Sequence, residues 1–198
     1  DPAIPFPGQP ISLREGMIRQ DSVIRALENQ GYHSIFISSS RLAFRGKDAF
    51  LKSLGFNETL GLETIPRFQD APKFAFDGVS DRVLYEEALA RLAVAQEKHK
   101  KIFLVIETTS SHEPFIDPDG GENTEKNVLT YVDKQLDWLG QQLKQNGTLD
   151  DGYLIVTGDH RKRMPVLQEE RRRYGPSAEA RMPLSLIHIS EPTRPERI

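Results

Sequence analysis

The sequence predicts an α/β fold with a mostly parallel β-sheet flanked by helices. Helical patterns alternate along the chain with short apolar runs, an order typical of parallel strands joined by helical crossovers. The second and third runs are continuously apolar rather than alternating, as expected for strands covered on both faces. The three runs occupy residues 34–38, 102–106 and 153–156.

The first predicted helix leads directly into the first strand. Two starts are possible for this helix. One is Ser12, which has capping-box spacing to Glu15, and the other is Asp21. It ends at Gly31, a residue type suited to the position after a helix. Its predicted buried face carries Val23, Ile24 and Leu27.

A short helix at residues 48–54 and a loop-rich connection at residues 57–79 come next. Ser80 or Asp81 then caps a long helix. Its core-facing stripe has helical spacing and consists of Leu84, Ala88, Leu92 and Ala95. Because residues 102–106 form the most hydrophobic run and lie between helices, we expect them to be a central parallel strand.

A third helix is predicted to start at Asn123 or Thr124 and to end at Gly147. Trp138 within it is interpreted as a packing residue rather than a ligand contact.

Residues 161–173 are dense in charge. We favour a solvated helix there over a surface for anionic headgroups or phosphate, and no interleaved aromatic residues support nucleic-acid binding.

Composition describes a single polar, globular domain. The chain has 198 residues, of which 37% are hydrophobic and 28% charged, with a net charge of −3. This balance favours neither nucleic acid nor a strongly acidic partner. The absence of cysteine excludes disulfides and thiolate metal sites within the chain. No run of 18 apolar residues exists to span a membrane.

Both ends suggest an internal piece of a longer protein. The chain opens at Asp1 without a starting Met or a signal peptide. The segment that begins at Leu184 resembles a translated sequencing adapter. We therefore expect a partial catalytic domain at residues 1–183 and a non-native tail at residues 184–198, and we assign no function to His188 and Glu191 of that tail.

The segment Gly158, Asp159, His160 directly follows the last apolar run. In open α/β sheets, ligands bind at the carboxyl ends of the strands. A carboxylate beside an imidazole suits a divalent cation such as Mn²⁺ or Zn²⁺. The alternative is a turn in which Asp159 caps the next segment and His160 is simply exposed. The position after a strand favours the metal site.

His112 follows the run at residues 102–106 in the setting Ser-His-Glu-Pro-Phe. Two strands thus end in polar clusters at what we expect to be one edge of one sheet. If they converge, Asp159 and His160 would bind the metal, and His112 would contact a phosphoryl or alcohol oxygen. A structural role for His112 is the alternative.

Basic residues Arg41, Arg45 and Lys47 lie just beyond the end of the first strand. They could contact an anionic group of a substrate. A solvated loop is the favoured interpretation from these residues alone.

Four segments together resemble a known family. They are Leu54-Gly55-Phe56, Ser111-His112-Glu113-Pro114-Phe115, Tyr131-Val132-Asp133 and Val156-Thr157-Gly158-Asp159-His160. Their order and spacing resemble the sulfatase-type catalytic domain of lipoteichoic acid synthases and related phosphoglycerol transferases, in the alkaline phosphatase superfamily. The resemblance covers about residues 10–183. It implies an incomplete alkaline-phosphatase-like or sulfatase-like α/β fold.

The resemblance implies that Asp159 and His160 are metal ligands. Manganese is the expected ion, with Zn²⁺, Mg²⁺ and Ca²⁺ as alternatives. It also implies that His112 lines the substrate pocket.

The same resemblance places the family's polar substrate-binding loop at about residues 38–47. Here the chain departs from the family. Ser38 replaces a histidine, Arg45 stands in the place of an aromatic residue, and Lys47 keeps the positive charge.

The family's nucleophile and first acidic ligand are expected to lie before Asp1, as are its membrane helices. The resemblance therefore implies no catalytic residue within the chain, and we expect the fragment alone to be inactive. With two protein ligands it should bind Mn²⁺ weakly. The complete protein is expected at the cell membrane, with its catalytic domain outside the cytoplasm.

Three functions are open. The first is a metal-dependent phosphoglycerol or related phosphoryl-headgroup transferase of the cell envelope, acting on a lipid-linked or glycan phosphodiester. The second is a sulfatase or phosphodiesterase, which transfers to water. An upstream Thr or Ser would favour the transferase, and a Cys/Ser-x-Pro-x-Arg sequence would favour the sulfatase. The third is a binding domain that has lost catalysis.

Overall fold

The computed structural model describes residues 22–99, 101–158, 168–175 and 186–190. The described residues divide into two compact units, one up to Leu139 and the other from Gly140 on. The sequence contains no signal for a boundary at this point.

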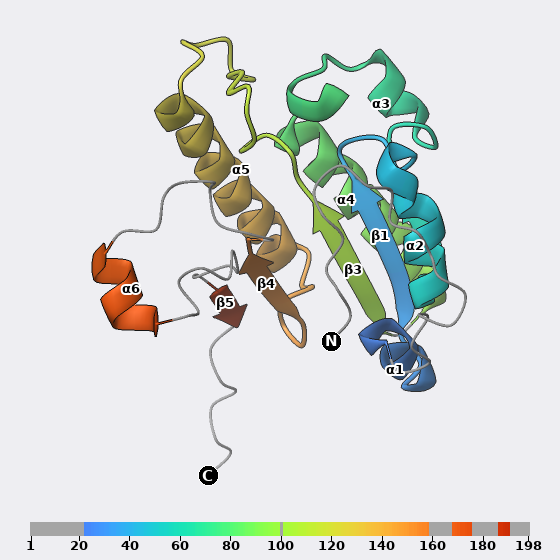
Figure 1. Cartoon of the computed structure of the whole chain (residues 1–198). Coiled ribbons are helices and arrows are strands. Elements are labelled where there is room, and N and C mark those ends of the chain that lie inside the picture. The colour runs from blue at the N-terminus through green and yellow to red at the C-terminus, as the bar shows by residue number, and fades with distance from the viewer. Residues whose placement is uncertain (1–21, 100, 159–167, 176–185, 191–198) are drawn as a thin grey trace. The chain divides into compact units, whose positions relative to one another are not determined.

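The first unit contains a three-stranded sheet in the order β2-β1-β3, with all strands parallel (Figure 1). These strands are β1 (His33–Ser38), β2 (Glu58–Leu60) and β3 (Ile102–Glu107). The predicted parallel sheet is confirmed, but β1 rather than β3 is its central strand. β3 was predicted to be central because of its hydrophobicity, yet its residues are only half-buried.

Helix α1 (Val23–Asn29) begins one residue after its N-cap Ser22, whose hydroxyl accepts a hydrogen bond from the backbone N–H of Arg25 at 3.2 Å. Of the two predicted starts, Asp21 precedes this N-cap by one residue, and Ser12 lies outside the described residues. Gly31 has a φ of 80°, as predicted for the residue that ends this helix. Val23 is 65% exposed, so its predicted burial is wrong. Only Ile24 of this short helix is fully buried.

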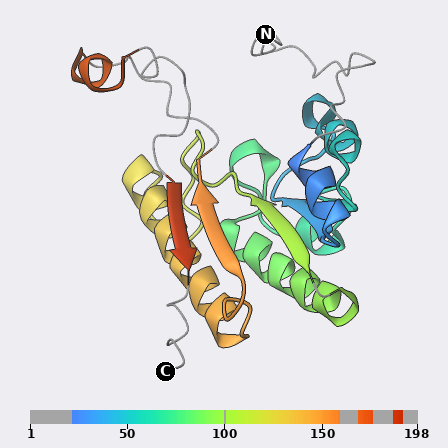
Figure 2. The same ribbon diagram turned by 90° about the horizontal axis from the view of Figure 1, so that it is seen from below.

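Helices cover both faces of the three-stranded sheet. Phe36 of β1 packs with Leu51 of α2 (Lys47–Leu54) on one face. Because side chains alternate along a strand, Ile35 and Ile37 lie on the opposite face, where α4 (Asp81–Lys98) packs against β1 and β3 (Figure 2). Ile35 and Ile37 are both almost fully buried, so the core of this unit surrounds β1.

Residues 57–79 are more regular than predicted. They contain β2, helix α3 (Pro66–Asp70) and the short 3₁₀ helix η2 (Ala75–Asp77), while a second one, η1 (Phe44–Gly46), precedes α2. These short elements were not predicted, because the three residues of β2 and the five residues of α3 are too few for a periodic pattern. Their placement depends on burial, and Ile65 and Phe68 are nearly or fully buried.

The predicted long helix is confirmed as α4, capped by Ser80. Its predicted stripe is buried at all four positions: Leu84, Ala88, Leu92 and Ala95. Helix α5 (Glu125–Gln145) is confirmed as well. Trp138 packs under the guanidinium of Arg82, which lies 3.6 Å from the ring centroid. This contact supports the interpretation of Trp138 as a packing residue.

The second unit contains β4 (Tyr153–Thr157), β5 (Leu186–Ser190) and α6 (Gln168–Tyr174). β4 pairs antiparallel with β5, and Tyr153 and Ile155 are 71% and 60% exposed. The prediction of a strand buried in a parallel sheet is therefore wrong for β4 in the described structure. Its side chains alternate between two faces, and one of these faces is largely exposed.

Helix α6 lies within the charged segment for which a solvated helix was predicted, and Arg171, Arg172 and Arg173 are exposed. β5 lies within the segment predicted to be a non-native tail, and the origin of that segment stays a prediction. Among the residues that the structure describes, no helix is long and apolar enough to cross a membrane.

Candidate functional site

The carboxyl ends of β1 and β3 form a polar edge. Ser38 and Glu107 are the last residues of the two strands and are register partners. Ser38 and Ser39 have no exposed surface. Because this is the edge at which open α/β sheets bind ligands, it is the candidate site of the first unit.

Lys47 and Ser38 both contact one oxygen of Glu107. Lys47 Nζ and Ser38 Oγ each donate a hydrogen bond of 2.5 Å to Glu107 Oε2. The side chains of Lys47 and Glu107 are 19% and 37% exposed. The predicted substrate-binding residue Lys47 is therefore held at the sheet edge as one half of a partly buried ion pair.

A second set of hydroxyl groups joins the two strand ends to the segment before α4. Ser39 Oγ and Thr109 Oγ1 are 2.9 Å apart, and Thr109 Oγ1 also donates to the carbonyl oxygen of Ala75 at 3.3 Å. A Cβ atom at Gly78 would lie 2.6 Å from Thr109 Oγ1. A side chain at Gly78 would therefore displace Thr109, so the close approach of these segments requires glycine there.

Asp81, at the start of α4, anchors the turn after β3. Ser110 Oγ donates a hydrogen bond of 2.6 Å to Asp81 Oδ1, and Asp81 has no exposed surface. Asp81 Oδ2 has no hydrogen-bond partner among the described residues. Burial raises the pKa of Asp81 to about 6, against the opposing effect of the hydrogen bonds from Ser110. The turn that carries His112 is thus tied to a buried carboxyl group.

His112 is exposed at the end of this turn. Its Nδ1 lies 2.7 Å from the carbonyl oxygen of Glu113, and its ring packs edge-on against Phe76 at 4.2 Å between centroids. A carbonyl oxygen only accepts hydrogen bonds, so Nδ1 carries the proton. In the neutral ring Nε2 is therefore an acceptor, suited to a hydroxyl group of a ligand.

Arg45 lies in an exposed aromatic region beside this turn. Its guanidinium is 5.6 Å from the centroid of Phe44, and Phe44 and Phe76 are 6.2 Å apart. Arg45, Phe76 and Asp77 have φ angles of 55° to 56°, in the left-handed region that such residues rarely adopt. Strained backbone of this kind often accompanies binding sites. Arg41 instead forms an ion pair with Asp77 at 2.9 Å.

The predicted metal ligands Asp159 and His160 lie outside the described residues. Within the described part of the chain, no group of three or more His, Asp or Glu side chains could hold a metal ion. A carboxylate and an imidazole, the donors of Asp159 and His160, fit Mn²⁺ or Zn²⁺.

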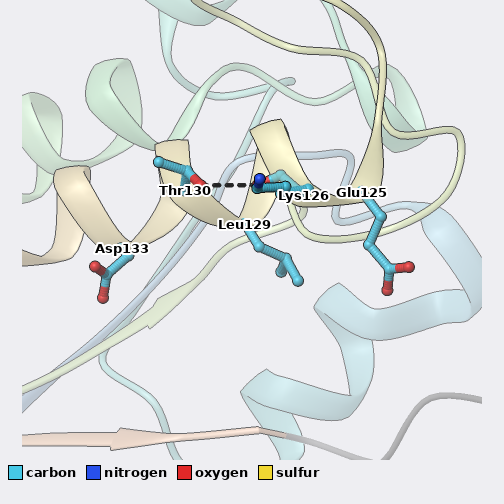
Figure 3. A pocket seen from close by; sticks show the side chains of 5 residues that line it. All are labelled: Glu125, Lys126, Leu129, Thr130 and Asp133. Atoms are coloured by element: carbon cyan, nitrogen blue, oxygen red, sulfur yellow. Dashed lines mark hydrogen bonds between the residues drawn. The ribbon is translucent and has the colours of Figure 1, made fainter.

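A shallow hollow of about 560 Å³ lies elsewhere, on α5 (Figure 3). The residues that line it are Glu125, Lys126, Leu129, Thr130 and Asp133. All five come from successive turns of one helix, and Thr130 Oγ1 simply donates to the Lys126 carbonyl oxygen at 2.8 Å. Since it contains no predicted site residue and no second element, we interpret it as an exposed helix face.

Sequence reasoning missed Glu107, Asp81 and Phe76 as parts of this edge. Glu107 could have been found from the sequence, because it is an acidic residue directly after an apolar run. The burial of Asp81 has no comparable signal, because an Asp beside a helix cap is usually exposed. Phe76 is recognisable only from its contact with His112.

Comparison with known proteins identifies the class of this fold. Residues 3–190 match the model of the sulfatase family. A protein of the alkaline phosphatase superfamily from Vibrio parahaemolyticus shares 25% identity, with a TM-score of 0.66 over 86% of this chain and 41% of that chain. The fold is thus that of the alkaline phosphatase superfamily, whose members include phosphotransferases and sulfatases. The chain belongs to the sulfatase family.

The relatives within this class include transferases. Phosphoglycerol transferase I of Salmonella paratyphi B is 27% identical over 146 residues, which cover 68% of this chain and 19% of that protein. The chain thus spans about a fifth of the length of this relative. The lipoteichoic acid synthase LtaP of Listeria monocytogenes has the same fold, with 24% identity and a TM-score of 0.66 over 84% of this chain and 45% of that chain. This is a sulfatase-like domain related to phosphoglycerol transferases.

Proposed function

We propose that the protein that carries this chain is a metal-dependent phosphoglycerol transferase, or a transferase of a related phosphoryl headgroup, in the cell envelope. The observation that carries the proposal is the polar edge of β1 and β3, where Lys47 and the turn of His112 follow the two strand ends. Such an edge is where this class of sheet binds its ligand. The 27% identity to phosphoglycerol transferase I supports the choice of substrate.

The chain's own residues would then take distinct roles. Asp159 and His160 would hold the divalent ion, Mn²⁺ in this proposal, and such an ion stabilises the negative charge that develops on a phosphoryl group. His112 would accept a hydrogen bond from a hydroxyl group of the substrate through Nε2. Arg45, exposed beside the aromatic ring of Phe44, would attract the anionic headgroup.

The proposed substrate is a lipid-linked or glycan phosphodiester, so the proposed location is the cell membrane, with this domain on its extracytoplasmic side. No nucleic-acid partner is proposed. A sulfatase is the second candidate, because the matching family model is that of sulfatases. The two candidates differ in the ester that they cleave and in the acceptor of the transferred group.

The test is turnover of fluorescent phosphatidylglycerol and of an aryl sulfate by the complete protein, with and without Mn²⁺. We expect Mn²⁺-dependent release of diacylglycerol, and a fall of at least about 100-fold in His160→Ala. His99→Ala is the matched control, because His99 stacks on His33 beside the amino end of β1. Full turnover in His160→Ala, or cleavage of the sulfate ester alone, would contradict the transferase proposal.

A further inference from the structure

The positive charge of Lys47 is compensated within the protein. Lys47 Nζ lies 2.5 Å from Glu107 Oε2, and only 19% of the lysine side chain is exposed. An anion that approaches Lys47 must therefore compete with a carboxylate already in contact. Arg45 differs, because its side chain is exposed. Its guanidinium lies over the ring of Phe44, and among the described residues it forms no ion pair.

Ser38 fixes the carboxylate in this position. Its hydroxyl, which has no exposed surface, donates to the same Glu107 oxygen at 2.5 Å. Glu107 is also the last residue of β3 and the register partner of Ser38, so its backbone is held by the sheet. The carboxylate is consequently not a mobile surface group that an incoming anion could displace at little cost.

Lys47 and its counter-ion Glu107 lie on different elements of the fold. Lys47 begins α2, whereas Glu107 ends β3, 60 residues later in the chain. An ion pair that only stabilised α2 could be made within the helix, as Lys52 and Asp48 do at 2.8 Å. The pair of Lys47 and Glu107 instead sets the charge of the candidate binding edge.

We propose that Glu107 is a specificity-determining residue that excludes anionic groups from the corner formed by Ser38, Lys47 and Glu107. This inference rests on the proposed function, because it assigns an uncharged part of the proposed substrate to this corner. The phosphodiester then lies outside the corner. Discrimination of this kind works by repulsion of the wrong ligand rather than by attraction of the right one.

Removal of the Glu107 charge should convert the corner into an anion site. Glu107→Gln keeps the size of the side chain and an oxygen that accepts from Ser38, but it leaves Lys47 without its counter-ion. We expect inorganic phosphate to bind this variant about tenfold or more tightly than the wild-type chain, because a partly buried ammonium group gains a charged partner. The gain should disappear in the double variant Glu107→Gln, Lys47→Met.

The experiment is a calorimetric titration of each variant with inorganic phosphate at pH 7.5 and low ionic strength. Asp48→Asn is the matched control: it removes a carboxylate from α2, whose partners are Lys52 and Thr59 rather than Lys47, and should leave the affinity unchanged. Glu107→Ala repeats the test without the amide group if Glu107→Gln folds poorly. Equal phosphate affinity in wild type and in both Glu107 variants would overturn the inference.

The titration involves no turnover, so its result does not depend on the proposed transferase activity. If phosphate binding rises as expected while the complete protein fails to cleave phosphatidylglycerol, the charge role of Glu107 stands and the assigned substrate is wrong. If cleavage occurs but phosphate binding does not change, the transferase proposal stands and the role of Glu107 is structural.

Discussion

Asp81 makes stability depend on pH. Its carboxyl group is fully buried, and burial raises its pKa from 3.8 to about 6. The folded chain therefore binds this proton more tightly than the unfolded chain does. The resulting contribution to stability is complete below pH 4 and is lost as the pH rises through 6, by on the order of 3 kcal/mol in total.

Substitution of Asp81 tests this linkage. Asp81→Asn keeps an oxygen that accepts from Ser110 but does not ionise. We expect its free energy of unfolding, relative to wild type, to rise between pH 4 and pH 7, as measured by urea denaturation across that range. Asp77→Asn, an exposed carboxylate paired with Arg41, is the control. Parallel pH profiles for wild type and Asp81→Asn would show that the group is not buried as described.

Single residues also show the limit of sequence reasoning at the site. Lys47 and His112 were candidates because a cation and an imidazole followed predicted strands. Both do follow strands in the structure, and their roles at the site stay predictions. The counter-ion of Lys47 was not recognisable. Glu107 lies 60 positions away, and only the register of β1 with β3 brings Glu107 beside Ser38.

Among the elements, α1 depends on its cap. Ser22 accepts from the N–H of Arg25, and its hydroxyl donates to the carbonyl oxygen of Leu54 at 2.6 Å. Ser22→Ala removes both contacts, so we expect a loss of about 1 to 2 kcal/mol in the free energy of unfolding. Val23→Ala, at an exposed position of the same helix, should change it by less than about 0.5 kcal/mol. Equal losses in the two variants, measured by urea denaturation, would contradict this account of the cap.

Helices were predicted better than strands. The cap at Ser80 and the buried stripe of α4 were read from local spacing, and the structure confirms both. β2 was missed because three half-buried residues carry no pattern of their own. β4 was placed in the parallel sheet because its run is apolar throughout, yet two of its five residues are among the most exposed large hydrophobic side chains described. Hydrophobicity alone does not specify the strand's partner.

At the scale of the whole molecule, the α/β class and the family were predictable, whereas the strand order was not. The alternation of helices and apolar runs indicated a parallel sheet, and the order β2-β1-β3 confirms one. The order itself arises from which strands pair, and this depends on contacts between distant segments. The prediction that Asp159, His160 and His112 share one metal-dependent site depends on the same kind of long-range arrangement and stays a prediction.

The most direct measurement of that claim is paramagnetic broadening of NMR signals by Mn²⁺, which detects weak binding. We predict that Mn²⁺ broadens the signals of Asp159, His160 and His112 before all others and spares those of His33 and His99. His160→Ala should abolish the effect. Broadening that leaves His112 unchanged, or that survives in His160→Ala, would contradict the prediction that Asp159 and His160 bind the metal and that His112 lines the substrate pocket beside it.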